Sequence, residues 1–184
     1  MTGCSVNPFW QNIFRKRPED ESVAAFLGST PLFAELDPRG LSTLEGRAHS
    51  RRYKRNETIF EEGDPGTGIY LVRSGRVRIF SRSGEKNERE LASLGPGDFF
   101  GENTLLAPAP RTASAHAQEN SELIGLFRAD LLDILRKHPS LGNKILLGLA
   151  RVLSERLQTV EKASTCAQQE TLTPDESDET ETAS

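Results

Sequence analysis

The chain has 184 residues, a formal net charge of −4 and a hydrophobic fraction of 35%. This length suits one domain with a single core and terminal extensions. No apolar run approaches the ~20 residues that a membrane span needs, and the N-terminus lacks the apolar segment of a secretion signal. We therefore expect a cytoplasmic protein without a membrane span.

The negative charge is concentrated at the C-terminus. Beyond Lys162 the chain contains six acidic residues and no Lys or Arg, so removing them changes the formal charge from −4 to +2. We therefore expect residues 164–184 to form a disordered acidic tail on a nearly neutral domain. The two cysteines, Cys4 and Cys166, lie in terminal segments and indicate neither a structural disulfide nor a metal site.

Residues 1–28 predict a helical extension. Asn7 and Pro8 combine a capping side chain with a first-turn proline. Large apolar residues then repeat at helical spacing, at Phe9, Trp10, Ile13 and Phe14. Such a helix either packs its aromatic face on the domain or docks on a partner or membrane surface. A second helix is expected over 18–27, where Gly28 ends it.

Two more short helices are expected before the first strand. Thr30-Pro31 and Asp37-Pro38 each repeat the pattern of a capping side chain followed by proline. They predict one helix over 32–36 and another from 38 toward His49. We place the start of the main domain at residue 29 and its end at residue 163.

The pattern changes to short strands between glycine-rich turns from about residue 50 to residue 127. The candidate strand cores are Tyr53, 58–60, 69–72, 77–80, 91–94, 113–117 and 123–127. Turn compositions separate them at 63–66, 74–75, 83–84 and 95–98. Regular short strands at this spacing predict a mainly β fold of the jelly-roll type, a double-stranded β-helix.

The chain returns to helix after residue 127. One helix is predicted over 128–138, and a longer one from about Pro139 to Lys162. Apolar residues recur along the longer helix at Leu141, Ile145, Leu149, Val152, Leu153, Leu157 and Val160. This spacing predicts a face that packs on the β-roll together with part of a coiled-coil seam.

The stretch from Gly97 to Ala113 carries the most specific chemistry. Gly97 and Gly101 permit backbone conformations and close approaches that a side chain would block. Glu102 is an acceptor suited to a sugar hydroxyl, and Arg111 is a planar, permanently charged donor suited to a phosphate. This stretch therefore predicts a pocket for a negatively charged sugar phosphate.

The same stretch resembles the phosphate-binding cassette of cyclic nucleotide-binding domains. The resemblance rests on Phe-Gly-Glu at 100–102, Leu-Leu at 105–106 and Arg-Thr-Ala at 111–113. It implies that Gly101 and Glu102 bind the ribose and that Arg111 binds the cyclic phosphate. The implied ligand-binding residues are Phe100, Gly101, Glu102, Asn103, Thr104, Leu105, Arg111, Thr112 and Ala113. Backbone amides of Thr104 and Thr112 are expected to complete the phosphate site, although this family usually has alanine or glycine in place of Thr104.

The choice between cAMP and cGMP stays open. In members of this family that accept cGMP, a threonine after the cassette arginine can bind the guanine amino group, and Thr112 occupies that position. Threonine is also an ordinary strand residue, so the two interpretations are near even. The resemblance further implies that the C-terminal helix covers the base, where Arg151 or Arg156 could reach it, and pairs with a second copy.

The resemblance predicts a regulatory module without enzymatic activity, covalent cofactor or metal. It would bind a cyclic nucleotide, change the position of its C-terminal helix and control an unidentified protein partner. About twenty polar, acidic residues follow the helix, so we expect no DNA-binding domain and no DNA binding. Two alternatives are a ligand-independent interaction scaffold on the same fold and a metal enzyme on a cupin-like barrel. The wide separation of His49, His116 and His138 disfavours the enzyme.

Overall fold

The computed structural model describes residues 21–82 and 88–170, with side chains placed as far as residue 159 in the last helix. The helix predicted around residues 9–14 and the acidic residues after 170 lie outside the described residues. Among the described residues no helix combines the length and apolarity of a bilayer-crossing segment.

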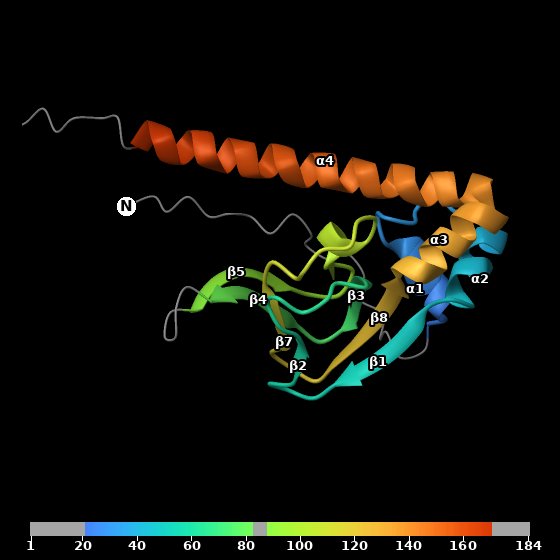
Figure 1. Ribbon diagram of the computed structural model, residues 1–184, viewed down its shortest axis with the longest axis horizontal. Coiled ribbons are helices and arrows are strands. Elements are labelled where there is room, and N and C mark those ends of the chain that lie inside the picture. The colour runs from blue at the N-terminus through green and yellow to red at the C-terminus, as the bar shows by residue number, and fades with distance from the viewer. Residues whose placement is uncertain (1–20, 83–87, 171–184) are drawn as a thin grey trace, which may run out of the picture.

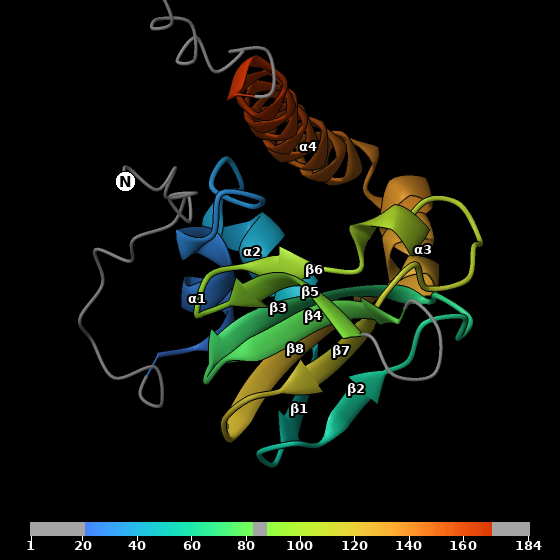
Figure 2. The same ribbon diagram turned by 90° about the vertical axis from the view of Figure 1, so that its left-hand side faces the viewer.

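Two four-stranded antiparallel sheets form the predicted jelly roll, which confirms the fold class (Figures 1 and 2). The first sheet has the order β1 (His49–Tyr53), β8 (Ser121–Phe127), β3 (Gly68–Ser74) and β6 (Phe99–Phe100). The second has the order β2 (Thr58–Phe60), β7 (Ser114–Ala117), β4 (Val77–Arg82) and β5 (Glu88–Leu94).

Strand β3 divides the molecule between two apolar clusters. Because successive side chains of a strand point to opposite faces, Tyr70 and Val72 enter the cluster inside the roll. Ile69 and Leu71 enter the cluster between the first sheet and the helices. Both faces of β3 are therefore covered, which explains why Gly68 to Val72 is continuously buried rather than alternating.

The N-terminal helices begin at side-chain caps. Helix α1 (Val23–Ser29) begins after Ser22, whose side chain accepts a hydrogen bond from Ala25 N, and α2 (Pro38–Glu45) begins after Asp37. The prediction of a helix over 32–36 is wrong: two successive turns occupy this stretch. They bury Leu32, Phe33 and Leu36 as a helix would, so the apolar spacing did not distinguish the two structures. Helix α2 ends at Glu45, earlier than predicted, because β1 begins at residue 49.

The C-terminal helices lie at the end of the roll that carries the cassette. Helix α3 (Arg128–Lys137) follows β8 directly, and α4 (Pro139–Glu170) then passes over the roll (Figures 1 and 2). Gly148 allows a close approach of α4, since a Cβ there would lie 2.2 Å from the Leu32 carbonyl oxygen. Helix α4 extends eight residues beyond the predicted end at Lys162, into the segment expected to be a disordered tail.

Candidate functional site

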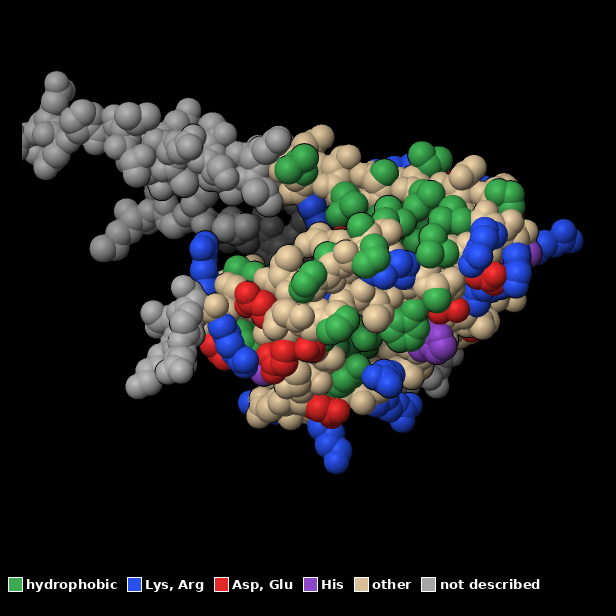
Figure 3. All heavy atoms as spheres, in the orientation of Figure 1, with side chains coloured by type: hydrophobic (Ala, Val, Ile, Leu, Met, Phe, Trp, Pro, Cys, Tyr) green, Lys and Arg blue, Asp and Glu red, His purple; other side chains and the backbone are tan. Residues whose placement is uncertain are grey.

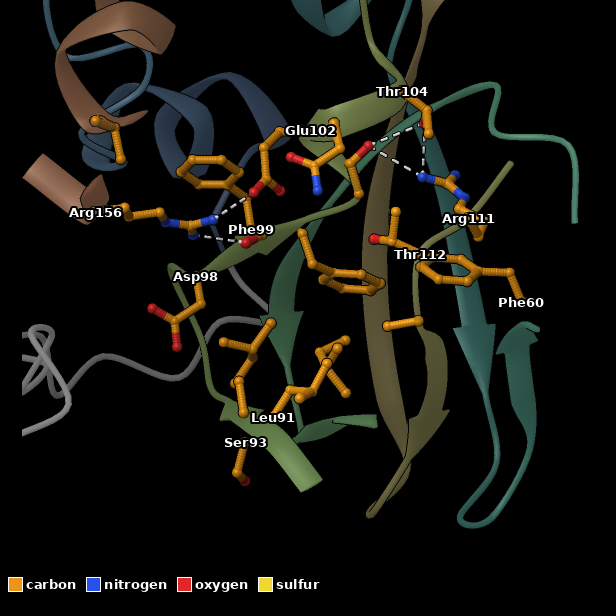
Figure 4. A pocket seen from close by; sticks show the side chains of 18 of the residues that line it. Phe60, Leu91, Ser93, Asp98, Phe99, Glu102, Thr104, Arg111, Thr112 and Arg156 are labelled. Atoms are coloured by element: carbon orange, nitrogen blue, oxygen red, sulfur yellow. Dashed lines mark hydrogen bonds and ion pairs between the residues drawn. The ribbon is translucent and has the colours of Figure 1, made fainter. Parts of the chain in front are cut away.

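A cavity of about 570 Å³ lies between the cassette, β5 and α4 (Figure 4). The structure brings eight of the nine predicted site residues into its wall, from Phe100 to Thr104 and from Arg111 to Ala113. The ninth, Leu105, lies outside this wall and packs in the cluster between the first sheet and the helices. The cassette therefore faces the cavity on one side and anchors itself in the core on the other.

Arg111 is held inside the roll at one end of the cassette. Its backbone N donates to Asp64 O at 2.8 Å, which positions the residue beside the turn formed by residues 61–66. Its side chain is only 5% exposed. Nη1 donates to Gly101 O at 3.0 Å and to Thr104 Oγ1 at 2.9 Å, and Nη2 donates to Gly68 O at 2.9 Å.

The Arg111 guanidinium lies against aromatic rings rather than against a carboxylate. Its guanidinium carbon lies 4.1 Å from the centroid of the Phe60 ring and 5.9 Å from that of Tyr70. Within the part of the chain that the structure describes, no carboxylate pairs with it and its buried Nε has no hydrogen-bond partner. Burial accordingly lowers the pKa of Arg111 below its ordinary value. A buried cation with an unused donor is well suited to an anion.

Gly101 is required by the position of Arg111. Its φ of 82° is left-handed, a conformation that side chains disfavour. A Cβ at Gly101 would also lie 2.4 Å from Arg111 Nη1 and 3.2 Å from Gly68 O. Both the local backbone and the packing of the guanidinium therefore require glycine here.

Glu102 forms the other polar end of the cassette and connects it to α4. Residues Glu102–Thr104 form one turn of 3-10 helix, η2. Glu102 Oε1 accepts a hydrogen bond from Arg156 Nη1 at 3.0 Å, and Arg156 Nη2 donates to Phe99 O at 2.8 Å (Figure 4). The Arg156 guanidinium carbon also lies 4.0 Å from the centroid of the Phe99 ring.

The structure distinguishes the two arginines that were expected as possible contacts for the nucleotide base. Arg156 lines the cavity, whereas Arg151 pairs on the exposed surface with Glu35 at 2.6 Å. Thr112 lines the cavity with an exposed side chain, as its predicted contact with a ligand requires. The Thr104 amide, expected to bind phosphate, instead points at Gly101 O at 3.4 Å.

The comparisons with known proteins agree with this fold. Residues 50–138 match the sequence profile described as "Cyclic nucleotide-binding domain". The chain is 34% identical to the solved N-terminal domain of a transcriptional regulator from Streptomyces coelicolor A3(2), with a TM-score of 0.65. That match covers 71% of this chain and 94% of the other. The chain belongs to the cyclic nucleotide-binding domain family.

A protein sequence and a crystal structure from Thermus thermophilus extend the comparison. The chain is 42% identical over 126 residues to its "Cyclic AMP receptor protein", covering 68% of this chain and 58% of that protein. The crystal structure of the Thermus thermophilus Catabolite Activator Protein has a TM-score of 0.67 at 38% identity, covering 76% of this chain and 63% of the other. The cyclic nucleotide-binding domain thus spans about three fifths of the length of these relatives, and the predicted family resemblance is confirmed.

Sequence reasoning missed one wall of the cavity. This wall consists of residues of β5, namely Leu91, Ala92, Ser93 and Leu94. Asp98 and Phe99, just before the cassette's Phe-Gly-Glu, also line it. The strand and the turn were predicted, but no local pattern says that β5 faces α4, because that depends on the order of strands in the second sheet.

Asp98 adds a carboxyl to the cavity, in addition to those of Glu102 and Glu155. Its Oδ2 accepts a hydrogen bond from Gly95 N at 2.8 Å, which closes the turn before the cassette. Burial raises the pKa of Asp98 above its ordinary value, while the Gly95 hydrogen bond and the charge of Arg156 oppose that rise. The cavity therefore holds carboxyls at its Glu102 end and a buried cation at its Arg111 end.

Proposed function

We propose that this domain is a regulatory module that binds a cyclic nucleotide, cAMP or cGMP, and controls a partner protein through α4. One observation carries the proposal: Arg111 is buried and lacks a carboxylate partner among the described residues, and its Nε donor is unused. A buried charge is costly unless it is compensated. A phosphodiester that enters the cavity supplies the missing negative charge and the missing acceptor.

Glu102, at the other end of the cassette, favours a nucleotide over a simple anion as the ligand. Glu102 accepts hydrogen bonds and donates none when ionised, so it selects a hydroxyl rather than a phosphate. Its Oε1 is used by Arg156, which leaves Oε2 for a ribose hydroxyl. A ligand with one phosphate charge and a neighbouring sugar hydroxyl matches both ends. The name of the Thermus "Cyclic AMP receptor protein" favours cAMP as the first ligand to test.

Helix α4 is the proposed output element. Arg156 joins it to the residue assigned to ribose and to the Phe99 carbonyl. A ribose hydroxyl on Glu102 changes the energy of this ion pair, so the nucleotide distinguishes positions of α4. A ligand shifts a conformational equilibrium only through such a difference in affinity. A change in the surface of α4 then alters partner binding.

Calorimetric titration with cAMP, cGMP and 5′-AMP tests this function. We expect micromolar or tighter binding of one cyclic nucleotide and weaker binding of 5′-AMP. Arg111→Ala should weaken binding by about 100-fold or more, because a charge-assisted contact in a buried site is lost. Arg52→Ala, at an 86% exposed side chain on β1, is the control and should bind as the wild type does. Absence of heat with both cyclic nucleotides would contradict the proposal.

A homodimer through α4 is part of the same proposal. Ile145, Leu149 and Val152 are buried against the domain, while Ala150, Leu153 and Leu157 are exposed on a neighbouring stripe. Figure 3 shows apolar side chains along the described part of α4. Leu146, partly buried, extends the exposed stripe into the 4-3-4 spacing of a coiled-coil seam.

Sedimentation equilibrium tests the dimer. Leu157→Glu, at a side chain that is 59% exposed, should shift the protein toward monomer. Leu132→Glu, at a 42% exposed leucine on α3, is the control and should leave the mass unchanged. Weak dimers form at concentrations on the order of tens of micromolar. A wild-type protein that is still monomeric in that range would contradict the proposed pairing.

A ligand-independent scaffold is the second candidate. It is favoured by the internal hydrogen bonds that already occupy both ends of the cassette, from Arg111 to Thr104 and from Arg156 to Glu102. The same titration separates the two functions, since a scaffold gives no heat and no difference between wild type and Arg111→Ala. We assign no enzymatic activity to the domain in either case.

A further inference from the structure

We propose that Thr104 is a positioning residue whose hydroxyl holds the Arg111 guanidinium so that its Nε side faces the ligand phosphate. This inference rests on the proposed function and concerns the affinity of the same site.

The Thr104 hydroxyl is fully committed within the cassette. Thr104 is 1% exposed. Its Oγ1 accepts a hydrogen bond from Arg111 Nη1 at 2.9 Å and donates one to Gly101 O at 3.1 Å. A hydroxyl has a single hydrogen to donate, so the donation to Gly101 turns a lone pair toward the guanidinium. The hydroxyl thus acts as a fixed acceptor for Arg111.

The hydrogen bonds of Arg111 use three of its five N–H donors. Arginine has five N–H donors in a planar arrangement. Nη1 uses two of them on Gly101 O and Thr104 Oγ1, and Nη2 uses one on Gly68 O. The remaining donors are the Nε–H, which is buried without a partner among the described residues, and one hydrogen of Nη2. Two such donors on neighbouring nitrogens suit two oxygens of one phosphate.

Thr104 is itself held from the opposite side. Gly66 makes room for it, since a Cβ at Gly66 would lie 2.3 Å from the Thr104 side chain. Arg128, the first residue of α3, donates through Nη2 to Thr104 O at 2.5 Å and to Gly66 O at 2.7 Å. The acceptor that positions Arg111 is therefore attached to both the 61–66 turn and α3, and cannot shift without them.

If Thr104 had the opposite role, its removal would change the ligand affinity in the opposite direction. If Thr104 instead competed with the phosphate for Nη1, removing its hydroxyl would release Arg111 and tighten binding. If it positions Arg111, removing the hydroxyl leaves Nη1 short of an acceptor and the guanidinium free to adopt unproductive orientations. The direction of the affinity change therefore decides between the two roles.

Thr104→Val and Thr104→Ser form the matched pair for the test. Valine keeps the branched shape beside Gly66 and removes the hydroxyl, whereas serine keeps the hydroxyl. In titrations with cAMP and cGMP we expect Val to weaken binding about ten-fold, the effect of one hydrogen bond to a charged group. Serine should bind within about two-fold of the wild type if the hydroxyl alone matters. Equal melting temperatures would show that both variants are folded.

Tighter or unchanged binding by Thr104→Val, or equal weakening in both variants, would overturn the positioning role and leave the proposed function intact. Absence of binding by the wild type would instead overturn the proposed function. A second measurement needs no nucleotide: the NMR signal of the Arg111 Nε–H group should be sharp in wild type and Thr104→Ser and broadened in Thr104→Val. The same signal in all three proteins would contradict the inference irrespective of ligand.

Discussion

The two polar ends of the cassette are built differently. Arg111 lies inside the roll, and its side-chain acceptors among the described residues belong to β3 or to the cassette: Gly68 O, Gly101 O and Thr104 Oγ1. Glu102 lies nearer the surface and shares its carboxylate with Arg156 of α4. One end is therefore complete without the C-terminal helix, and the other end depends on it.

Because of this difference, we expect ligand affinity and the conformational response of α4 to depend on different residues. The Arg111 end provides a preorganised cation whose geometry owes nothing to the position of α4, so it should dominate binding. The Glu102 end couples the ligand to the helix, so it should dominate any conformational response. Variants at the two ends are expected to affect different measurements.

Arg111→Lys should cause the largest loss of affinity among conservative changes. Lysine keeps the positive charge but lacks the planar set of donors that bonds to Gly101, Thr104 and Gly68 simultaneously. We expect a weakening of about 100-fold, or roughly 2–3 kcal/mol, in calorimetric titration with the preferred cyclic nucleotide. Binding equal to that of wild type would show that the phosphate needs only a charge at this end.

Gly101→Ala and Gly97→Ala compare two glycines with similar backbones. Their φ values are 82° and 91°, so alanine at either position should cost about 1–2 kcal/mol of unfolding free energy. Only at Gly101 does the added Cβ meet Arg111, whereas no atom lies within 4 Å at Gly97. We expect both variants to lose stability in urea titrations, and only Gly101→Ala to lose nucleotide affinity as well. An equal loss of affinity in Gly97→Ala would show that the loss does not result from a displaced Arg111.

Arg156→Ala should change the response of α4 more than the affinity. We expect an affinity change of about ten-fold or less, as for one partly exposed ion pair. In the wild type, nucleotide should alter hydrogen exchange around residues 150–159, and Arg156→Ala should abolish most of that change. Arg151→Ala removes an exposed pair on the same helix and is the control that should respond normally. A full response in Arg156→Ala would place the coupling elsewhere.

Asp98→Asn should have the smallest effect, and the effect should depend on pH. Burial raises the pKa of Asp98 in the folded protein above its value in the unfolded chain, so ionisation destabilises the fold. The cost is absent below the unfolded pKa and grows as pH rises through the folded pKa. Asparagine keeps an acceptor for Gly95 N without the charge. We therefore expect the variant to be more stable at pH 7 by less than about 1 kcal/mol.

Denaturation of Asp98→Asn and wild type between pH 4 and pH 7 measures this difference. The two stabilities should converge at the acidic end, where Asp98 is protonated. A wild type that is more stable than Asp98→Asn at pH 7, with the difference disappearing at acidic pH, would mean that the carboxylate stabilises the fold, contrary to the direction of its pKa change.

The sequence was sufficient to predict the β-roll and the chemical character of the two ends of the cassette. Short apolar strands between glycine turns are local patterns, and so is the nine-residue spacing from Glu102 to Arg111. A periodic pattern reports burial rather than backbone shape, which is why the turns at 32–36 were mistaken for a helix. The end of α4 was placed too early for a related reason, since polar residues after Lys162 do not prevent a helix from continuing.

Only the tertiary structure decided which groups meet. Arg156 reaches Glu102, β5 walls the cavity, and Thr104 binds Arg111 because strand order and the path of α4 bring distant segments together. Those contacts depend on the packing of β3 between two clusters and on the close approach of α4 at Gly148. Residue types determine what each group can bind, whereas packing determines which partner it finds, and no local pattern contains that second piece of information.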